Sequence, residues 1–402
     1  MTTQQDMSPT RTVVTLAALS AIAAFSIDTY IPAIPTMAKA LSAPIHKVEL
    51  SISTFFIGYA LGQLFGGPLS DRLGRRRVAL MGLSLFLFSS FLLIFSQAVW
   101  QLLALRTVQA VGGGFATVVA GATVRDLYEG REGARMMSLV QSVTMGAPLV
   151  APAVGTILLA GFSWHAIFLF LCAYALFLMG ILYRRYPVSG RPVQAGNAMT
   201  LGHVSREYAS VLLHPVSPWF MLVHTFACGG LYAFLTESAF MYMGYFGVAE
   251  ALFPVLFSSG VVVVIILSRL NARLVRRVNP MGLLTCGILI QVVCGIALAV
   301  QASFLTPTLP VTVALNLLYI GSLGLIMGNT VSGNLQNFPE KSGTAHALMG
   351  VINCLGGAVA GITASHFHDG SLKPLAWVMC LSALFALGFL IILRKRMHMG
   401  VR

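Results

Sequence analysis

Long apolar stretches fill most of this chain, and polar residues gather in the short segments between them. A helix needs about 20 mostly apolar residues to cross a hydrocarbon layer about 30 Å thick. Twelve stretches have this length, and they predict membrane-spanning helices at residues 13–34, 50–70, 78–96, 100–122, 137–160, 164–184, 217–242, 250–268, 281–303, 310–332, 343–365 and 374–394. The pattern therefore predicts an all-α membrane protein with twelve spans.

The basic residues support this count, because arginine and lysine collect in the cytoplasmic loops of membrane proteins. With twelve spans, one face receives only Lys39, Lys47 and Lys373 of the 25 basic residues, and Arg106 lies inside a span. All the others fall on the opposite face. We therefore expect a multi-pass protein of the bacterial inner membrane with both termini in the cytoplasm.

The longest polar connection, residues 185–216, divides the chain into two halves. It predicts an N-terminal six-helix bundle at 1–184, a cytoplasmic linker with one surface helix, and a C-terminal six-helix bundle at 217–402. A weak repeat supports two related halves, since residues 271–278 repeat the arginine spacing of residues 71–78. Parallel six-helix repeats predict a central substrate cavity between the halves.

Composition excludes a soluble protein, because 57% of the 402 residues are hydrophobic and only 9% are charged. The mean hydropathy is +0.84. The net charge of +13 sits in short loops beside apolar runs, so we assign it to topology and anionic lipid, not to nucleic acid. All six cysteines fall in apolar segments and predict buried free thiols. No nucleotide-binding, nucleophilic or metal-ligating constellation is visible, so we expect no enzyme, cofactor or metal.

Three charged residues fall within predicted spans, where a charge costs several kcal/mol and indicates function. These are Asp28, Arg106 and Glu237. Asp28 and Arg106 lie at similar depth, so we expect them to pair across the cavity and to couple transport to protons. The alternative is a buried ion pair that only fixes helix packing. Glu237 is expected at the outer interface, although it is also a candidate for the cavity.

Other polar residues in apolar surroundings are candidates either for the substrate cavity or for bridges between helices. His224 and Glu237 lie 13 positions apart on one helix, so the two cannot share a face. His366, His368 and Asp369 are expected in a solvated outer loop. The remaining candidates of the C-terminal half are Tyr232, Asn316, Asn329, Asn334 and Asn353.

The turn after the second predicted span concentrates charge between two apolar runs. It resembles the loop between the second and third helices of the major facilitator superfamily, whose pattern G-x-x-x-D-R-x-G-R-R is met by Gly67, Asp71, Arg72, Gly74, Arg75 and Arg76. The resemblance implies the major facilitator fold and a conformational latch. We expect Asp71 to meet a guanidinium such as Arg125, or a helix N-terminus of the other half.

Three further segments resemble the twelve-span drug:proton antiporters, and within them the bicyclomycin and chloramphenicol resistance (Bcr/CflA) branch. The first two carry D-x-Y-x-P-A-x-P and R-x-x-Q-x-x-G, met by Asp28, Tyr30, Pro32, Ala33, Pro35, Arg106, Gln109 and Gly112. The third resembles the antiporter motif of the fifth helix through Pro148, Pro152 and Gly155, although alanines replace its first two glycines. Arg125 and Asp126 also resemble this branch and are counted with the latch. Tyr30 and Gln109 are expected to line the cavity.

Function follows from these resemblances and from the lack of any nucleotide site. We expect a monomeric, proton-coupled antiporter that exports drugs or small metabolites by alternating access. An uptake carrier or uniporter of the same fold is the alternative, and a membrane receptor that does not transport is a third possibility. The substrate cannot be read from the sequence.

Overall fold

The computed structural model describes residues 9–128, 130–185, 201–338 and 341–399, and all regular structure in these ranges is helical. Twelve helical segments there are long and apolar enough to cross a membrane, which confirms the predicted count and fold class. The chain divides into two compact units. Unit 1 holds Met1–Leu41 and Thr54–Val204, and unit 2 holds Ser42–Ser53 and Ser205–Arg402.

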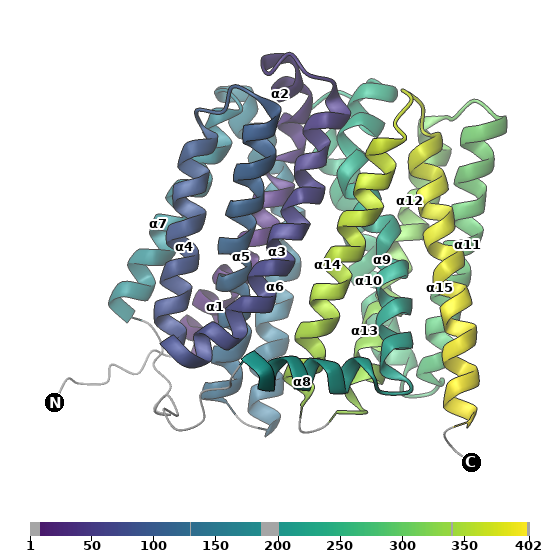
Figure 1. The fold of residues 1–402 in the computed structure, drawn as a ribbon. Helices are drawn as coiled ribbons and strands as arrows, with labels where there is room; N and C mark the ends of the chain where they lie inside the picture. The colour runs from purple at the N-terminus through teal and green to yellow at the C-terminus, as the bar shows by residue number, and fades with distance from the viewer. Residues whose placement is uncertain (1–8, 129, 186–200, 339–340, 400–402) are drawn as a thin grey trace. The chain divides into compact units, whose positions relative to one another are not determined.

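Unit 1 is built from the helices α1 to α7, of which α3 also contributes its first turns to unit 2 (Figure 1). In chain order they are α1 Pro9–Asp28, η1 Ile31–Ala33, α2 Ile34–Ala40, α3 Ile45–Leu73, α4 Arg75–Leu93, α5 Val99–Leu127, α6 Gly130–Gly161 and α7 His165–Arg185. Helices α4 and α5 lie side by side (Figure 1). Their backbones approach closely, because a Cβ on Gly112 would lie 2.4 Å from the carbonyl oxygen of Gly82. Small residues permit such an approach between membrane helices.

Unit 2 contains the remaining helices. They are α8 Leu201–Leu212, α9 Ser217–Ala239, the π-helical η2 Phe240–Tyr245, α10 Phe253–Leu274, α11 Pro280–Phe304, α12 Leu309–Gly321, α13 Leu323–Leu335, α14 Ser342–His366 and α15 Lys373–Met399. Helix α9 packs against both α14 and α15 (Figure 1). Helices α12 and α13 meet at Ser322 and together form one span.

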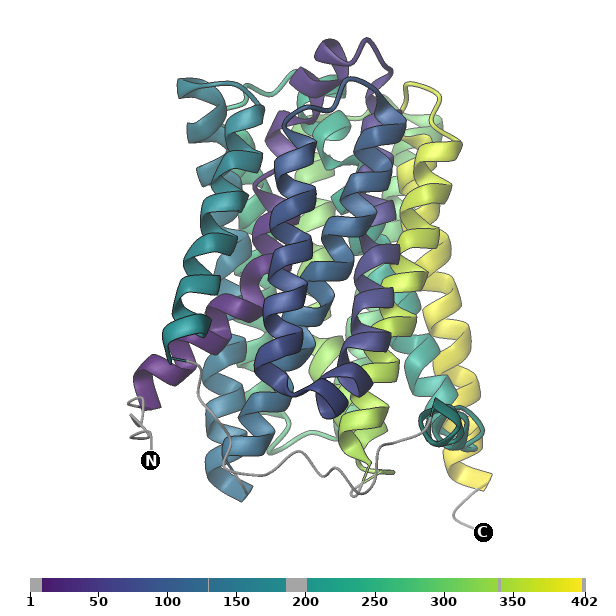
Figure 2. The same ribbon diagram turned by 60° about the vertical axis from the view of Figure 1, so that its left-hand side comes forward.

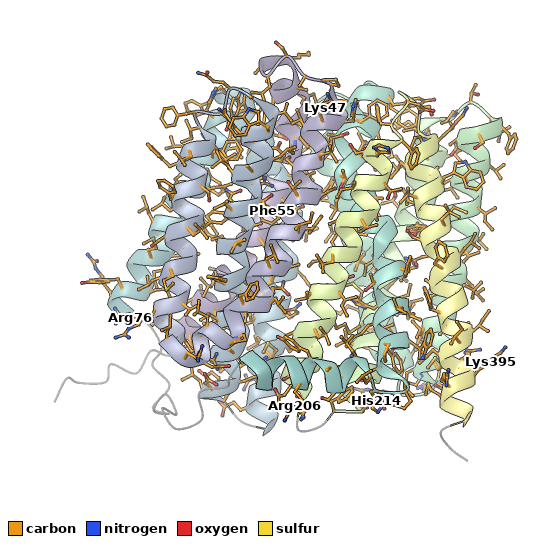
Figure 3. All side chains as sticks on the ribbon, in the orientation of Figure 1. Lys47, Phe55, Arg76, Arg206, His214 and Lys395 are labelled. Carbon is orange, nitrogen blue, oxygen red and sulfur yellow. The ribbon has the colours of Figure 1, made fainter. Side chains whose placement is uncertain are left out.

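Helix α8 corresponds to the surface helix expected in the linker, whose residues 186–200 lie outside the described ranges. It crosses one end of unit 2 at a large angle to α9 and α14, and Figure 2 shows it almost end on. Val211 is fully buried against Met221, Leu348 and Met349. Within unit 2, Lys47 lies at the end opposite to Arg206 and Lys395, as the predicted loop assignment requires (Figure 3).

Two helix boundaries differ from the prediction in ways that affect the charged residues. Helix α3 begins at Ile45, five residues earlier than expected, so Glu49 lies one turn inside it. Pro44 precedes this start, and proline is favoured at the first positions of helices. The first span is interrupted after Asp28 and continues as η1 and α2.

Candidate functional site

The end of α1 is set by two prolines and places Asp28 at the last position of the helix. Pro32 has no N–H to donate to the Asp28 carbonyl, and Pro35 has none for the Ile31 carbonyl. The loss of these two backbone hydrogen bonds accounts for the end of α1 at Asp28. The Asp28 side chain is 5% exposed. Among the described residues it has no hydrogen-bond or ion-pair partner.

Arg106 lies about two turns inside the start of α5 and is fully buried. Its Nη1 donates to the Ser26 carbonyl at 3.1 Å, to the Ser26 hydroxyl at 2.8 Å and to Gln109 Oε1 at 2.7 Å. Its Nε and Nη2 have no partner. A guanidinium stays protonated in proteins, so this site holds a buried cation that only neutral acceptors solvate.

Two aromatic rings flank the guanidinium. The Arg106 Cζ lies 4.6 Å from the ring centroid of Tyr30 and 4.6 Å from that of Phe55. A cation over an aromatic face is attracted by the ring quadrupole, with a gain of about 2 kcal/mol when desolvated. Gln109 continues the network by donating from Nε2 to Ser90 at 2.7 Å. Tyr30 and Gln109 were expected to line the substrate cavity, and here both contact Arg106 and are fully buried.

The expected ion pair between Asp28 and Arg106 is not formed in this structure. No ion pair joins them among the described residues, because Arg106 is held by Ser26 instead, two positions before Asp28. The site therefore contains a buried carboxyl group without a partner and a buried guanidinium without a counter-ion. If α1 moves relative to α5, the Asp28 carboxylate can replace Ser26 as the partner of the Arg106 guanidinium.

Helix α6 meets the break in the first span through Gly155. A Cβ on Gly155 would lie 2.1 Å from the carbonyl oxygen of Thr29, so only glycine fits where the two backbones cross. Pro148 and Pro152 lie inside α6, about two turns and one turn before this crossing. The predicted antiporter-motif helix thus packs directly beside Asp28.

The charged turn between α3 and α4 is organised around Arg75. Its guanidinium contacts Asp71 Oδ1 at 2.5 Å and Asp126 Oδ2 at 2.9 Å, and so joins the ends of α3, α4 and α5. Asp71 was expected to meet a guanidinium such as Arg125, and in this structure the guanidinium in contact is that of Arg75, four residues on, while Arg125 interacts with Asp71 electrostatically. Gly74 has φ +91°, a conformation that side chains rarely adopt.

Other motif residues of this turn have separate roles. Arg76 donates to the carbonyls of Leu182, at 3.1 Å, and Tyr183, and a cation is favourable at the C-terminal end of a helix such as α7. Arg72 is exposed, and a Cβ on Gly67 would meet only Val118, at 3.7 Å.

Glu237 is not at a solvated interface, which corrects the sequence interpretation. It is 2% exposed, and its Oε2 lies 3.2 Å from Nδ1 of His368. The expectation of a solvated loop is also wrong for His368, although His366 and Asp369 are exposed as expected. Depth counted along α9 placed Glu237 near the interface, but the loop after α14 folds back over it. Hydroxyl and backbone donors of Ser371 hold the pKa of Asp369 below its usual value.

Glu49 was missed by the sequence analysis, which began the second span at residue 50. It is fully buried, and its Oε1 accepts a hydrogen bond from the Phe240 backbone at 2.9 Å. The proline before α3 could have located the helix start and with it this third buried carboxyl group.

The remaining candidates of unit 2 lie in separate places. His224 Nδ1 lies 2.8 Å from the Thr330 hydroxyl, and Asn353 donates to the Tyr232 hydroxyl at 2.8 Å. Asn329 donates to Asn271 at 2.8 Å, and Asn334 is fully buried, so both join helices. A small cavity is lined by Asn316 together with Met241, Gln301, Thr312 and Met379. The described cysteines are free and, except for Cys286, buried.

Twelve spanning helices with isolated charges buried among them define a secondary transporter rather than a channel or a soluble carrier. The sequence profile of the Major Facilitator Superfamily matches residues 16–361, and the chain belongs to this family.

Relatives with curated names match over nearly the whole chain. A bicyclomycin resistance protein homolog of Haemophilus influenzae is 29% identical over 91% of this chain and 92% of its own length. A chloramphenicol resistance protein of Pseudomonas aeruginosa is 28% identical over 92% of this chain and 87% of its own length. These similarities match the Bcr/CflA branch of drug:proton antiporters, as the motifs predicted. Among solved structures, a D-xylose-proton symporter has a TM-score of 0.71 at 18% identity, covering 94% of this chain and 97% of its own. That likeness shows the fold.

Proposed function

We propose that this chain is a proton-coupled antiporter that exports drugs or small metabolites from the bacterial cytoplasm by alternating access. In this proposal it acts as a monomer in the inner membrane, with both termini cytoplasmic and with no enzymatic step. The relatives named for bicyclomycin and chloramphenicol resistance support the substrate class. The observation that carries the coupling is a buried Asp28 carboxyl without a partner among the described residues, two residues after Ser26, which holds the Arg106 guanidinium that has no counter-ion.

Asp28 is the proton carrier in this mechanism. A carboxyl group in a desolvated site favours its neutral form, and a cation at contact distance favours its ionised form. In the present structure Arg106 is engaged by Ser26 and Gln109, so it does not compete with a proton for Asp28. A helix movement that brings Asp28 to the free Nε and Nη2 would form an ion pair and expel the proton.

Arg106 has the right geometry to alternate between partners. Its Nη1 is held at the α1 side, while two other nitrogens keep their donors unused. A planar guanidinium can donate two parallel hydrogen bonds to one carboxylate through such a pair of nitrogens. Substrate binding that favours one arrangement then changes the number of bound protons, because the coupling between two ligands is reciprocal.

The loop around Asp71, Arg75 and Asp126 serves as the conformational latch in this proposal. Its charges join the ends of three helices of unit 1, so loss of one contact alters how these ends pack. We propose that the latch biases the populations of the inward-open and outward-open states.

Reconstituted protein tests the proposal. We expect a pH gradient across proteoliposomes to drive chloramphenicol, used as the probe with bicyclomycin, in the direction opposite to proton flow. Movement of drug and protons in the same direction would identify an uptake carrier instead. Drug flux that does not respond to a pH gradient would identify a uniporter, and a lack of flux for the whole panel would favour a receptor. Glu250→Gln, an exposed carboxylate outside these sites, is the matched control.

A further inference from the structure

The first turns of α3 dock on unit 2, whereas α3 from Thr54 onward belongs to unit 1. The contacts come from residues 46, 49 and 53, whose spacing places them on one face of the helix. The His46 carbonyl accepts a hydrogen bond from the Ser365 hydroxyl at 2.7 Å, close to the C-terminal end of α14. The Glu49 carboxyl accepts from the start of η2.

The contact is close along its whole length. Ser53 Oγ lies 3.2 Å from Thr236 Oγ1 of α9. A Cβ on Gly361 of α14 would lie 2.3 Å from Ser53 Oγ and 2.4 Å from Thr236 Oγ1, so α14 offers glycine where α3 lies against it. This is a shaped docking site for α3 and not an incidental contact.

Two carboxyl groups are buried together in this site. Glu49 is fully buried and Glu237 is 2% exposed, and the two interact electrostatically. Each has one oxygen without any hydrogen-bond partner, Oε2 in Glu49 and Oε1 in Glu237. A buried acceptor without a partner costs about 1–3 kcal/mol, and more when it is charged.

Two histidines adjoin the carboxyl groups, and only one of them contacts a carboxylate. His368 Nδ1 faces Glu237 Oε2 at 3.2 Å. The His46 ring stacks on the His368 ring with centroids 5.1 Å apart, and it interacts electrostatically with His368, Glu237 and the exposed Lys47. Positive charge on His368 and Lys47 opposes a charge on His46, so one imidazolium balances one carboxylate and the second carboxylate lacks a counter-ion.

A shared proton resolves this imbalance. Two neighbouring carboxylates repel one another in a desolvated site, and one proton shared between them removes one of the two charges. The proton also turns one orphan carboxyl oxygen into a donor. When the first turns of α3 leave the site, both groups meet water, ionise, and release that proton.

We propose that Glu49 and Glu237 form a proton-binding site that fastens the first turns of α3 to unit 2 while it is protonated. This inference deepens the proposed function, on which it rests, by adding a second proton site distinct from Asp28. Lys47, two residues before Glu49, lies at the end of unit 2 opposite Arg206 and Lys395, which is the outer end under the proposed topology (Figure 3).

The sign of the pH dependence follows from linkage. The docked state binds more protons than the undocked state, so docking is complete at low pH and weakens as pH rises. If one proton leaves on undocking, the docking equilibrium changes by about tenfold per pH unit where the site titrates.

Distance measurement between spin labels tests this without substrate or gradient. Labels at Lys47→Cys and Lys373→Cys, both exposed positions of unit 2, are attached in a background with the six native cysteines replaced. Samples in nanodiscs are frozen across a range from about pH 5 to about pH 9. We expect a single docked distance at low pH and a growing longer distance at high pH.

Neutral variants complete the test. Glu49→Gln combined with Glu237→Gln should keep the docked distance at every pH, while Glu250→Gln should follow the wild type. A wild-type distance independent of pH would overturn the inference, as would a double variant that titrates like the wild type. A response to sodium at constant pH would show that the site takes a metal cation and not a proton.

The outcome is separable from that of the proposed function. A pH-independent docked distance removes the second proton site and leaves antiport through Asp28 intact. Transport that is independent of protons removes the antiport proposal, even if the docked distance still titrates.

Discussion

Replacing Arg106 by lysine keeps the positive charge and removes the planar, forked guanidinium. The Nη1 nitrogen of Arg106 donates three hydrogen bonds, and the centroids of two aromatic rings each lie 4.6 Å from its Cζ. Each hydrogen bond to a charged group contributes about 1.5–3 kcal/mol, and each desolvated cation–π contact about 0.5–2 kcal/mol. A compact ammonium cannot contact both aromatic rings and donate hydrogen bonds to both Ser26 and Gln109 at once.

We take the loss as one charged hydrogen bond and one ring contact, or about 2–5 kcal/mol. At about 1.4 kcal/mol per tenfold change, this corresponds to a roughly 30-fold to 4000-fold fall in coupled transport. The assay is pH-driven chloramphenicol flux in proteoliposomes, normalised to the amount of folded protein. Arg106→Lys with wild-type flux would refute the view that guanidinium geometry matters.

Arg106→Gln separates function from stability at the same position. The glutamine amide can still donate to Ser26 or Gln109, and it removes a buried cation without a counter-ion. A buried ion carries a desolvation penalty of several kcal/mol, and removing a cation that has no counter-ion relieves this penalty, which offsets the lost hydrogen bonds and ring contacts. We therefore expect unchanged or higher thermal stability together with loss of proton coupling. A variant that melts far below the wild type would show that Arg106 mainly fixes helix packing.

Two further predictions concern the latch and the packing around Asp28. Asp71→Asn should lower transport while expression is intact, because it weakens the contact with Arg75; unchanged inward and outward populations in cross-linking would exclude the latch. Gly155→Val should destabilise the protein by about 1–3 kcal/mol or more, because its Cβ would meet the Thr29 carbonyl at 2.1 Å. Gly161→Val, where nothing lies within 4 Å, should melt like the wild type, and equal melting temperatures for both variants would contradict this packing.

The sequence predicted the spans because they depend on local chemistry, since apolar length determines which segments cross the membrane. The break after Asp28 has an equally local cause, because the prolines at 32 and 35 remove specific backbone donors.

Contacts over long distances in the chain could not be predicted. Nothing in the sequence indicates that Ser26 would hold Arg106, or that the loop after α14 would bring His368 to Glu237. For Asp71 the sequence indicated a guanidinium partner but not which arginine supplies the contact, which in this structure is Arg75, one helical turn away. Glu49 was missed because a span boundary was placed one residue beyond it.

The central claim is that Asp28 carries the coupled proton, and substrate-induced proton release from detergent-solubilised protein tests it most directly. The measurement adds chloramphenicol to weakly buffered protein over a range from about pH 6 to about pH 9. The wild type and Glu250→Gln should release protons on drug addition, and Asp28→Asn should release none. If Asp28→Asn releases as many protons as the wild type, the carrier lies elsewhere and the account is wrong.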